Sequence, residues 1–75
     1  MMRGYRLYQR LGAKIRTRRV RAGMTQQELG DACGLTRASI SNIETQGQKP
    51  MLHTLCLMAD ALDTTPESLL KGAWS

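Results

Sequence analysis

The chain has 75 residues and a mass of 8.4 kDa, which allows one small domain (residues 1–75) and excludes most enzyme folds. Hydrophobic residues make up 41% and charged residues 23%, so the composition is that of a globular chain rather than a disordered one. The formal net charge is +5, and residues 1–22 carry eight Lys and Arg but no Asp or Glu. This basic surface predicts a polyanionic partner, nucleic acid before an anionic membrane, although a solvated face without a partner stays open.

The first predicted helix covers about residues 6–22. Leu7, Leu11 and Ile15 recur every fourth residue and form one apolar stripe. Gly23 ends the helix as the residue after its last turn. The other cations of this helix are expected to give diffuse electrostatic support: Arg10, Lys14, Arg16, Arg18 and Arg21.

Two short capped helices follow. Thr25 and Glu28 form a capping box, in which each side chain bonds the backbone of the other, so a helix over about 26–33 is predicted. After Gly34 and a short turn, Thr36 caps a third helix over about 37–45.

A loop rich in Gly and Pro then leads to two further helices. The apolar stripe of the fourth helix is Leu52, Leu55, Ala59 and Leu62. Thr65 caps a last short helix that has Pro66 at its first position and runs to Leu70. Helices this short are not stable alone in water, so all five must share one core, which residues 7–70 supply.

Metal and catalytic sites are not indicated. Cys33, Cys56 and His53 are too few and wrongly spaced for a zinc site, and His53 has no partner for catalysis. Two buried, reduced thiols in a cytoplasmic protein are expected, with Cys56 in a helix contact, while a disulfide stays open. The sequence therefore predicts no cofactor, no metal and no enzymatic activity, and it has no apolar run of membrane-spanning length.

A helix, a Gly-containing turn and a second capped helix are the layout of a DNA-binding helix-turn-helix, here at about 25–45. Residues 11–70 resemble the phage repressor and Cro-type helix-turn-helix family (the XRE family). The resemblance lies in the run LGAKIRTRRVRAGMTQQELGDACGLTRASISNIE and, more loosely, in Pro50 to Leu55. It implies an all-α, compact five-helix lambda-repressor-like DNA-binding domain.

The resemblance implies that the third helix enters the major groove of DNA. Helical spacing turns Ile40 and Ile43 inward, which leaves the candidate base contacts outward: Arg37, Ala38, Ser41 and Asn42. Arg can donate two hydrogen bonds to guanine, Asn can pair with adenine, and the Ala methyl can contact thymine. The implied phosphate contacts are Thr25, Gln26, Thr36, Ser39, Thr45, Lys49 and Arg19. Ordinary solvated surface residues are the alternative for each.

Arg19 lies four residues after Ile15 on the apolar stripe, where a lone charge is costly, so it needs an acceptor. In relatives the acid that closes the recognition helix pairs with this arginine, and the matching residue here is Glu44. The resemblance thus implies a structural ion pair beneath the DNA backbone.

Two further residues are singled out on the fourth helix and at the end of the chain. Leu57 is expected to face outward and, with Trp74, to form an apolar patch that pairs two chains. Asp31 matches a position through which some relatives touch RNA polymerase.

The resemblance therefore implies a cytoplasmic, bacterial or phage-encoded DNA-binding transcriptional regulator. The simplest form is a dimeric repressor or autoregulator on a palindromic operator in double-stranded DNA, without a membrane partner. The alternatives are a controller protein of a restriction–modification operon, an antitoxin that neutralises a toxin, and a basic module that binds membrane surfaces.

Overall fold

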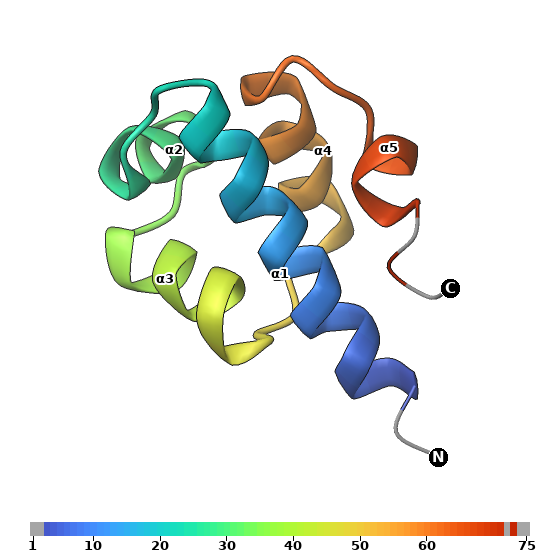
Figure 1. The fold of residues 1–75 in the computed structure, drawn as a ribbon. Helices are drawn as coiled ribbons and strands as arrows, with labels where there is room; N and C mark the ends of the chain where they lie inside the picture. The colour runs from blue at the N-terminus through green and yellow to red at the C-terminus, as the bar shows by residue number, and fades with distance from the viewer. Residues whose placement is uncertain (1–2, 72, 74–75) are drawn as a thin grey trace.

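The computed structural model describes residues 3–71 and 73. Over these residues the chain forms five helices and no strand, and the all-α prediction is confirmed. The helices are α1 (Arg3–Arg21), α2 (Gln26–Cys33), α3 (Arg37–Gln46), α4 (Leu52–Ala61) and α5 (Pro66–Leu70). In Figure 1, α1 runs across the molecule with α3 on one side and α5 on the other, while α2 packs against α3 and α4.

The predicted caps begin the short helices. Thr25 Oγ1 accepts a hydrogen bond from the backbone N–H of Glu28 at 3.0 Å, and the Glu28 carboxylate accepts one from the Thr25 N–H at 2.8 Å. Thr36 and Thr65 cap α3 and α5 in the same way, by accepting from the N–H three residues on. These bonds satisfy amides that have no partner within the helix, so the helices begin where the sequence places them.

A left-handed glycine ends both helices of the helix-turn-helix. Gly34, at φ 72°, follows α2, and the N–H of Leu35 donates to the Gly30 carbonyl at 2.8 Å. A Cβ on Gly30 would lie 2.6 Å from the Leu35 carbonyl oxygen, so the tight turn requires glycine there. Gly47, at φ 69°, ends α3, which is why this helix reaches Gln46, one residue beyond the prediction.

The core lies where all five helices meet, and its largest fully buried side chains are Leu11, Ile15, Leu29, Ile40, Ile43, Met58 and Leu69. Here α1 and α3 approach closely, because Gly12 faces the Ile43 backbone. A Cβ at Gly12 would overlap the Ile43 carbonyl oxygen. This contact holds α3 against α1, the longest helix of the fold.

Three expectations for α4 are wrong. Leu52 is 74% exposed because it occupies the first position of the helix, beyond the elements that cover the apolar stripe. Met58 is fully buried instead. Leu57, which was expected to face outward, is half-buried and packs against the core. The reason is that α4 contacts both α2 and α5, so more of its circumference is covered than the single apolar stripe predicts. Cys56 is exposed rather than packed between helices.

Several cations of α1 bind the end of α5. The Lys14 ammonium donates to the backbone carbonyls of Ser68 at 3.0 Å and Lys71 at 2.6 Å. Arg18 donates to the Ser68 hydroxyl at 2.9 Å, and Arg10 to the Ala73 carbonyl at 3.4 Å. These residues have specific partners rather than the diffuse role expected of them, and Lys14 satisfies carbonyls that the end of a short helix leaves without partners. In the described part of the chain, no helix has the length and apolar character to cross a bilayer.

Candidate nucleic-acid interface

The outer surface of α3 presents the residues predicted to contact bases. Arg37, Ala38 and Asn42 are exposed and Ser41 is half-buried, while Ile40 and Ile43 face the core with at most 1% of their surface exposed. Helical spacing explains this arrangement: Ile40 and Ile43 are buried in the core and fix the rotation of α3 about its axis, so the residues between and beside them face solvent. The structure therefore places all the candidate base contacts on the solvent side of one helix.

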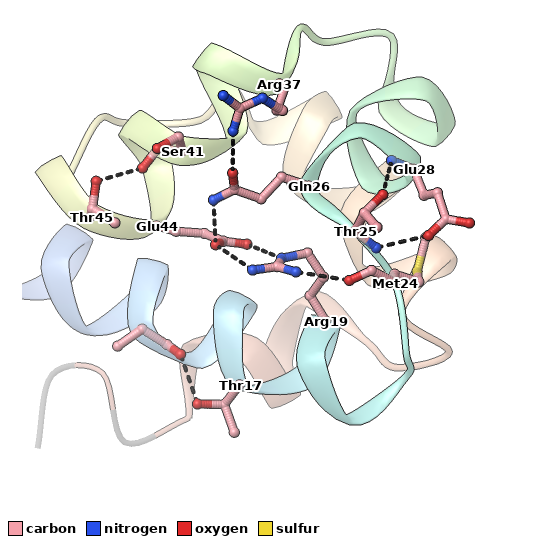
Figure 2. A network of polar contacts seen from close by, with 11 residues as sticks. Thr17, Arg19, Met24, Thr25, Gln26, Glu28, Arg37, Ser41, Glu44 and Thr45 are labelled. Carbon is pink, nitrogen blue, oxygen red and sulfur yellow. Dashed lines mark hydrogen bonds and ion pairs between the residues drawn. The ribbon is translucent and has the colours of Figure 1, made fainter.

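The candidate phosphate contacts lie around this helix and several are already engaged. The Thr36 and Ser39 hydroxyls are 3.0 Å apart within the cap of α3. Thr45 donates to the Ser41 carbonyl at 2.7 Å (Figure 2). Lys49 is exposed, and its ammonium lies 5.6 Å from the centre of the Tyr8 ring, within the range of a cation–π contact.

The predicted ion pair between Arg19 and Glu44 is present. Arg19 Nε donates to Glu44 Oε2 at 2.7 Å, and its Nη2 donates to Oε1 at 3.1 Å, which is the two-bonded geometry that suits a guanidinium and a carboxylate. Arg19 Nη1 also donates to the Met24 carbonyl at 2.8 Å. The Glu44 side chain is fully buried and that of Arg19 is 11% exposed, so the pair links α1 to the end of α3 in a site shielded from water.

Sequence reasoning missed the role of the Gln26 side chain. Its Nε2 donates to Glu44 Oε1 at 3.2 Å, and its Oε1 accepts from Arg37 Nη1 at 3.1 Å. Figure 2 shows the resulting chain of contacts from Arg19 through Glu44 and Gln26 to Arg37. Among the described residues no buried side-chain nitrogen or oxygen lacks a partner. No sequence signal marks these contacts, because they depend on how α2 and α3 meet in the folded protein.

The remaining candidates lie away from this network. Asp31 is exposed on α2 and accepts a hydrogen bond from Gln27 at 2.9 Å. Cys33 and Cys56 are both free thiols, and burial raises the pKa of the Cys33 thiol. Over the residues that the structure describes, no three His, Cys, Asp or Glu side chains gather where they could hold a metal ion. Trp74 lies outside the described residues.

Two capped helices at a tight glycine turn, with the second presenting polar side chains outward, define a helix-turn-helix protein. The helix-turn-helix family model matches residues 15–69, and the chain belongs to this family, in the repressor type that its sequence resembles. The fold is accordingly the lambda-repressor-like one.

The relatives include Repressor protein C2 of Salmonella phage P22, which is 34% identical over 64 residues. The match covers 85% of this chain but only 30% of that repressor. The P22 c2 repressor solved with synthetic operator 9T has a TM-score of 0.77 and 34% identity, covering 83% of this chain and 94% of that one. The restriction–modification controller protein C.AhdI from Aeromonas hydrophila has a TM-score of 0.78 and 27% identity, with the same coverage.

Proposed function

We propose that the chain is a sequence-specific DNA-binding transcriptional regulator, not an enzyme, and that α3 reads the major groove. The observation that carries the proposal is the outer surface of α3, where Arg37, Ala38 and Asn42 are exposed beside a core that fixes their direction. The solved complex of the similar P22 c2 repressor with an operator supports the same partner, double-stranded DNA. Direct readout in the groove uses these side-chain types.

The assignment of base and phosphate contacts is tested by substitution and salt. Arg37→Ala should cost about 1–3 kcal/mol of binding free energy at one base pair and relax the preference there. Lys49→Ala should weaken all sequences alike and reduce the slope of log affinity against log salt by about 1. Lys71→Ala is the matched control, because Lys71 is exposed at the end of α5, across the molecule from α3 in Figure 1. If the Arg37→Ala protein keeps the wild-type base preferences, the surface that contacts the bases is not this part of α3.

We further propose that the protein works as a homodimer on a palindromic operator. One short helix reads too few base pairs to mark a single genomic site, whereas two copies read half-sites about 34 Å apart. Leu57 is half-buried against the core, so it offers less apolar surface to a second copy than a fully exposed side chain does. Met51 and Leu52, which are 75% and 74% exposed, are better candidates. Of these two, Leu52 lines an apolar hollow of about 280 Å³ between α1, α4 and α5.

Leu52→Glu tests the dimer, because it would place two like charges in a shared apolar contact. We expect weaker dimerisation and weaker operator binding with the helical content unchanged, measured by sedimentation with and without operator DNA. Leu57→Glu should instead destabilise the fold, because Leu57 is half-buried against the core. A Leu52→Glu protein that still dimerises normally would move the interface to another surface, and a wild-type monomer on the operator would refute the dimer.

A controller of a restriction–modification operon is the second candidate function. The similarity to C.AhdI, over 94% of that chain, favours it. The test is the position of the binding sites. Footprints upstream of both its own gene and an adjacent endonuclease gene support a controller, and sites at unrelated promoters refute it.

A further inference from the structure

The loop that joins α3 to α4 is built against the first turns of α1. In Figure 1 this loop passes beside the N-terminal half of α1. Gly47 ends α3, and a Cβ there would lie 3.0 Å from Cγ of Gln9. Two residues further on, the Lys49 ammonium lies over the ring of Tyr8, 5.6 Å from its centre. Pro50 completes the contact, since it lines the same apolar hollow as Tyr8.

The ring of Tyr8 is a fixed support for this ammonium. Tyr8 is half-buried and packs against the core. It lies three residues before the fully buried Leu11, and both side chains line the apolar hollow. A cation within about 6 Å of the centre of an aromatic ring is attracted electrostatically by the face of the ring. Lys49 therefore rests on a surface that the core holds in place.

Lys49 is restrained at its backbone as well as at its ammonium. Because it precedes Pro50, its backbone is confined to extended conformations. A free Lys side chain has many rotamers, and their loss on binding a phosphate lowers the affinity. Among the described residues, Lys49 makes no hydrogen bond and no ion pair, whereas Lys14 donates to two carbonyls. The Lys49 ammonium thus keeps its N–H donors for phosphate oxygens while the ring limits its motion.

The surroundings of Lys49 favour the DNA backbone as its partner. Lys49 follows the C-terminal end of α3, whereas Arg37, which the proposed function places in the groove, is the first residue of that helix. No Asp or Glu occurs in residues 1–22 or 45–59, so neither segment offers a carboxylate that competes for the ammonium. A contact with phosphate positions a protein on DNA and reads no base. A restrained Lys49 should therefore raise affinity without changing specificity.

We propose that Tyr8 is a positioning residue that holds Lys49 for a phosphate of the DNA backbone. The inference rests on the proposed function, because it gives Lys49 its phosphate in the complex with DNA. The family model begins at residue 15, so this role of the first turns of α1 lies outside the region that defines the family. The ring acts through the ammonium alone, so its loss weakens binding to every sequence by the same factor.

Two substitutions of Tyr8 test the role of the ring, on an operator selected from a random duplex library and on an unrelated duplex. Tyr8→Leu removes the ring and keeps an apolar side chain against the core. Its dissociation constant should rise about 2- to 5-fold on both duplexes, which is the range of an exposed cation–π contact. Tyr8→Phe keeps the ring and should bind both duplexes as the wild type does. Urea unfolding verifies that each variant is folded under the binding conditions.

A double-mutant cycle shows whether the ring acts through Lys49. In a Lys49→Ala background, Tyr8→Leu should have no further effect on affinity. An effect through the fold or through dimerisation would persist there. Lys71→Ala is the matched control background, because Lys71 is an exposed lysine at the end of α5, and Tyr8→Leu should keep its full effect in it.

Nuclear magnetic resonance of the free protein tests the contact without DNA. The ring should shift the ε-methylene protons of Lys49 upfield in the wild type and in Tyr8→Phe, but not in Tyr8→Leu. Absence of this shift from the wild type would overturn the proposal, as would an equal loss of affinity from Tyr8→Leu with and without Lys49. A neutral Lys49→Ala in a protein that binds its operator through Arg37 would overturn this inference alone. Failure of the wild-type protein to bind any duplex would overturn the proposed function, and this inference with it.

Discussion

Removal of Arg19 from its pair with Glu44 should be among the most destabilising single changes in this protein. Arg19→Met deletes three hydrogen-bond donors, two of them to a carboxylate whose side chain has 0% exposure. Among the described residues, Glu44 would then keep only the Gln26 amide as a partner. Loss of one member of a buried pair costs about 3–5 kcal/mol. A domain of this length has only about 4–11 kcal/mol of unfolding free energy in total, so the variant should lose about a quarter of its stability or more.

The double variant Arg19→Met/Glu44→Leu provides the decisive comparison. A buried ion pair replaced by apolar residues of similar volume is often neutral, because two desolvation costs disappear together with the attraction. The loss of unfolding free energy in the double variant should therefore be smaller than the sum of the two single losses. The difference, which is the coupling energy of the pair, should be about 2–3 kcal/mol. Urea unfolding followed by circular dichroism measures each free energy, and Arg16→Met, an exposed change on the same helix, should stay within about 0.5 kcal/mol of wild type. Additivity of the two single changes would refute the pairing as a stabilising contact.

Three other outcomes follow from the packing. Gly12→Ala should destabilise the fold by about 1–3 kcal/mol in thermal unfolding, because its Cβ would overlap the Ile43 carbonyl where α1 crosses α3; a neutral result would mean that the helices can separate freely. A thiol reagent at mildly alkaline pH should add to Cys56 and spare Cys33 until unfolding, because burial raises the pKa of the Cys33 thiol and blocks access; mass spectrometry that finds both modified in the native state would contradict this. Lys14→Met should speed amide hydrogen exchange in α5 and cost about 1 kcal/mol, because two carbonyls lose their donor; unchanged exchange would show that α5 is held by its apolar side alone.

The helices of this protein are predictable because their signals are local. Thr25 and Glu28 satisfy each other within one turn, and Gly34 and Gly47 end their helices by a backbone conformation that other residues rarely adopt. Such signals act within three or four residues, so they can be read before any tertiary contact is known. The need of Arg19 for a partner could be predicted because a charge on an apolar stripe requires an acceptor, but only the family resemblance indicated that the acceptor is Glu44.

The errors on α4 have a tertiary cause. Periodicity places Leu52 and Leu55 on one stripe, but it contains no information about where the covering helices end. Likewise, Leu57 and Cys56 adjoin in sequence, and only the positions of α2 and α5 decide which of the two is packed and which is exposed. The contacts of Gln26 were hidden for the same reason, because they depend on the angle at which α2 and α3 meet.

The cations of α1 show why charge distribution indicates a partner but not a binding surface. Lys14 and Arg18 are four residues apart and lie on the side of the helix that meets α5. Arg19, one residue further on, is rotated by about 100° and meets α3 instead. Substitution of Lys14 would therefore change DNA binding only through the stability of the fold, whereas substitution of Arg19 would also release Glu44, and with it the orientation of Gln26. Affinity loss in an arginine or lysine variant of α1 identifies a DNA contact only when the unfolding free energy of that variant has been measured beside it.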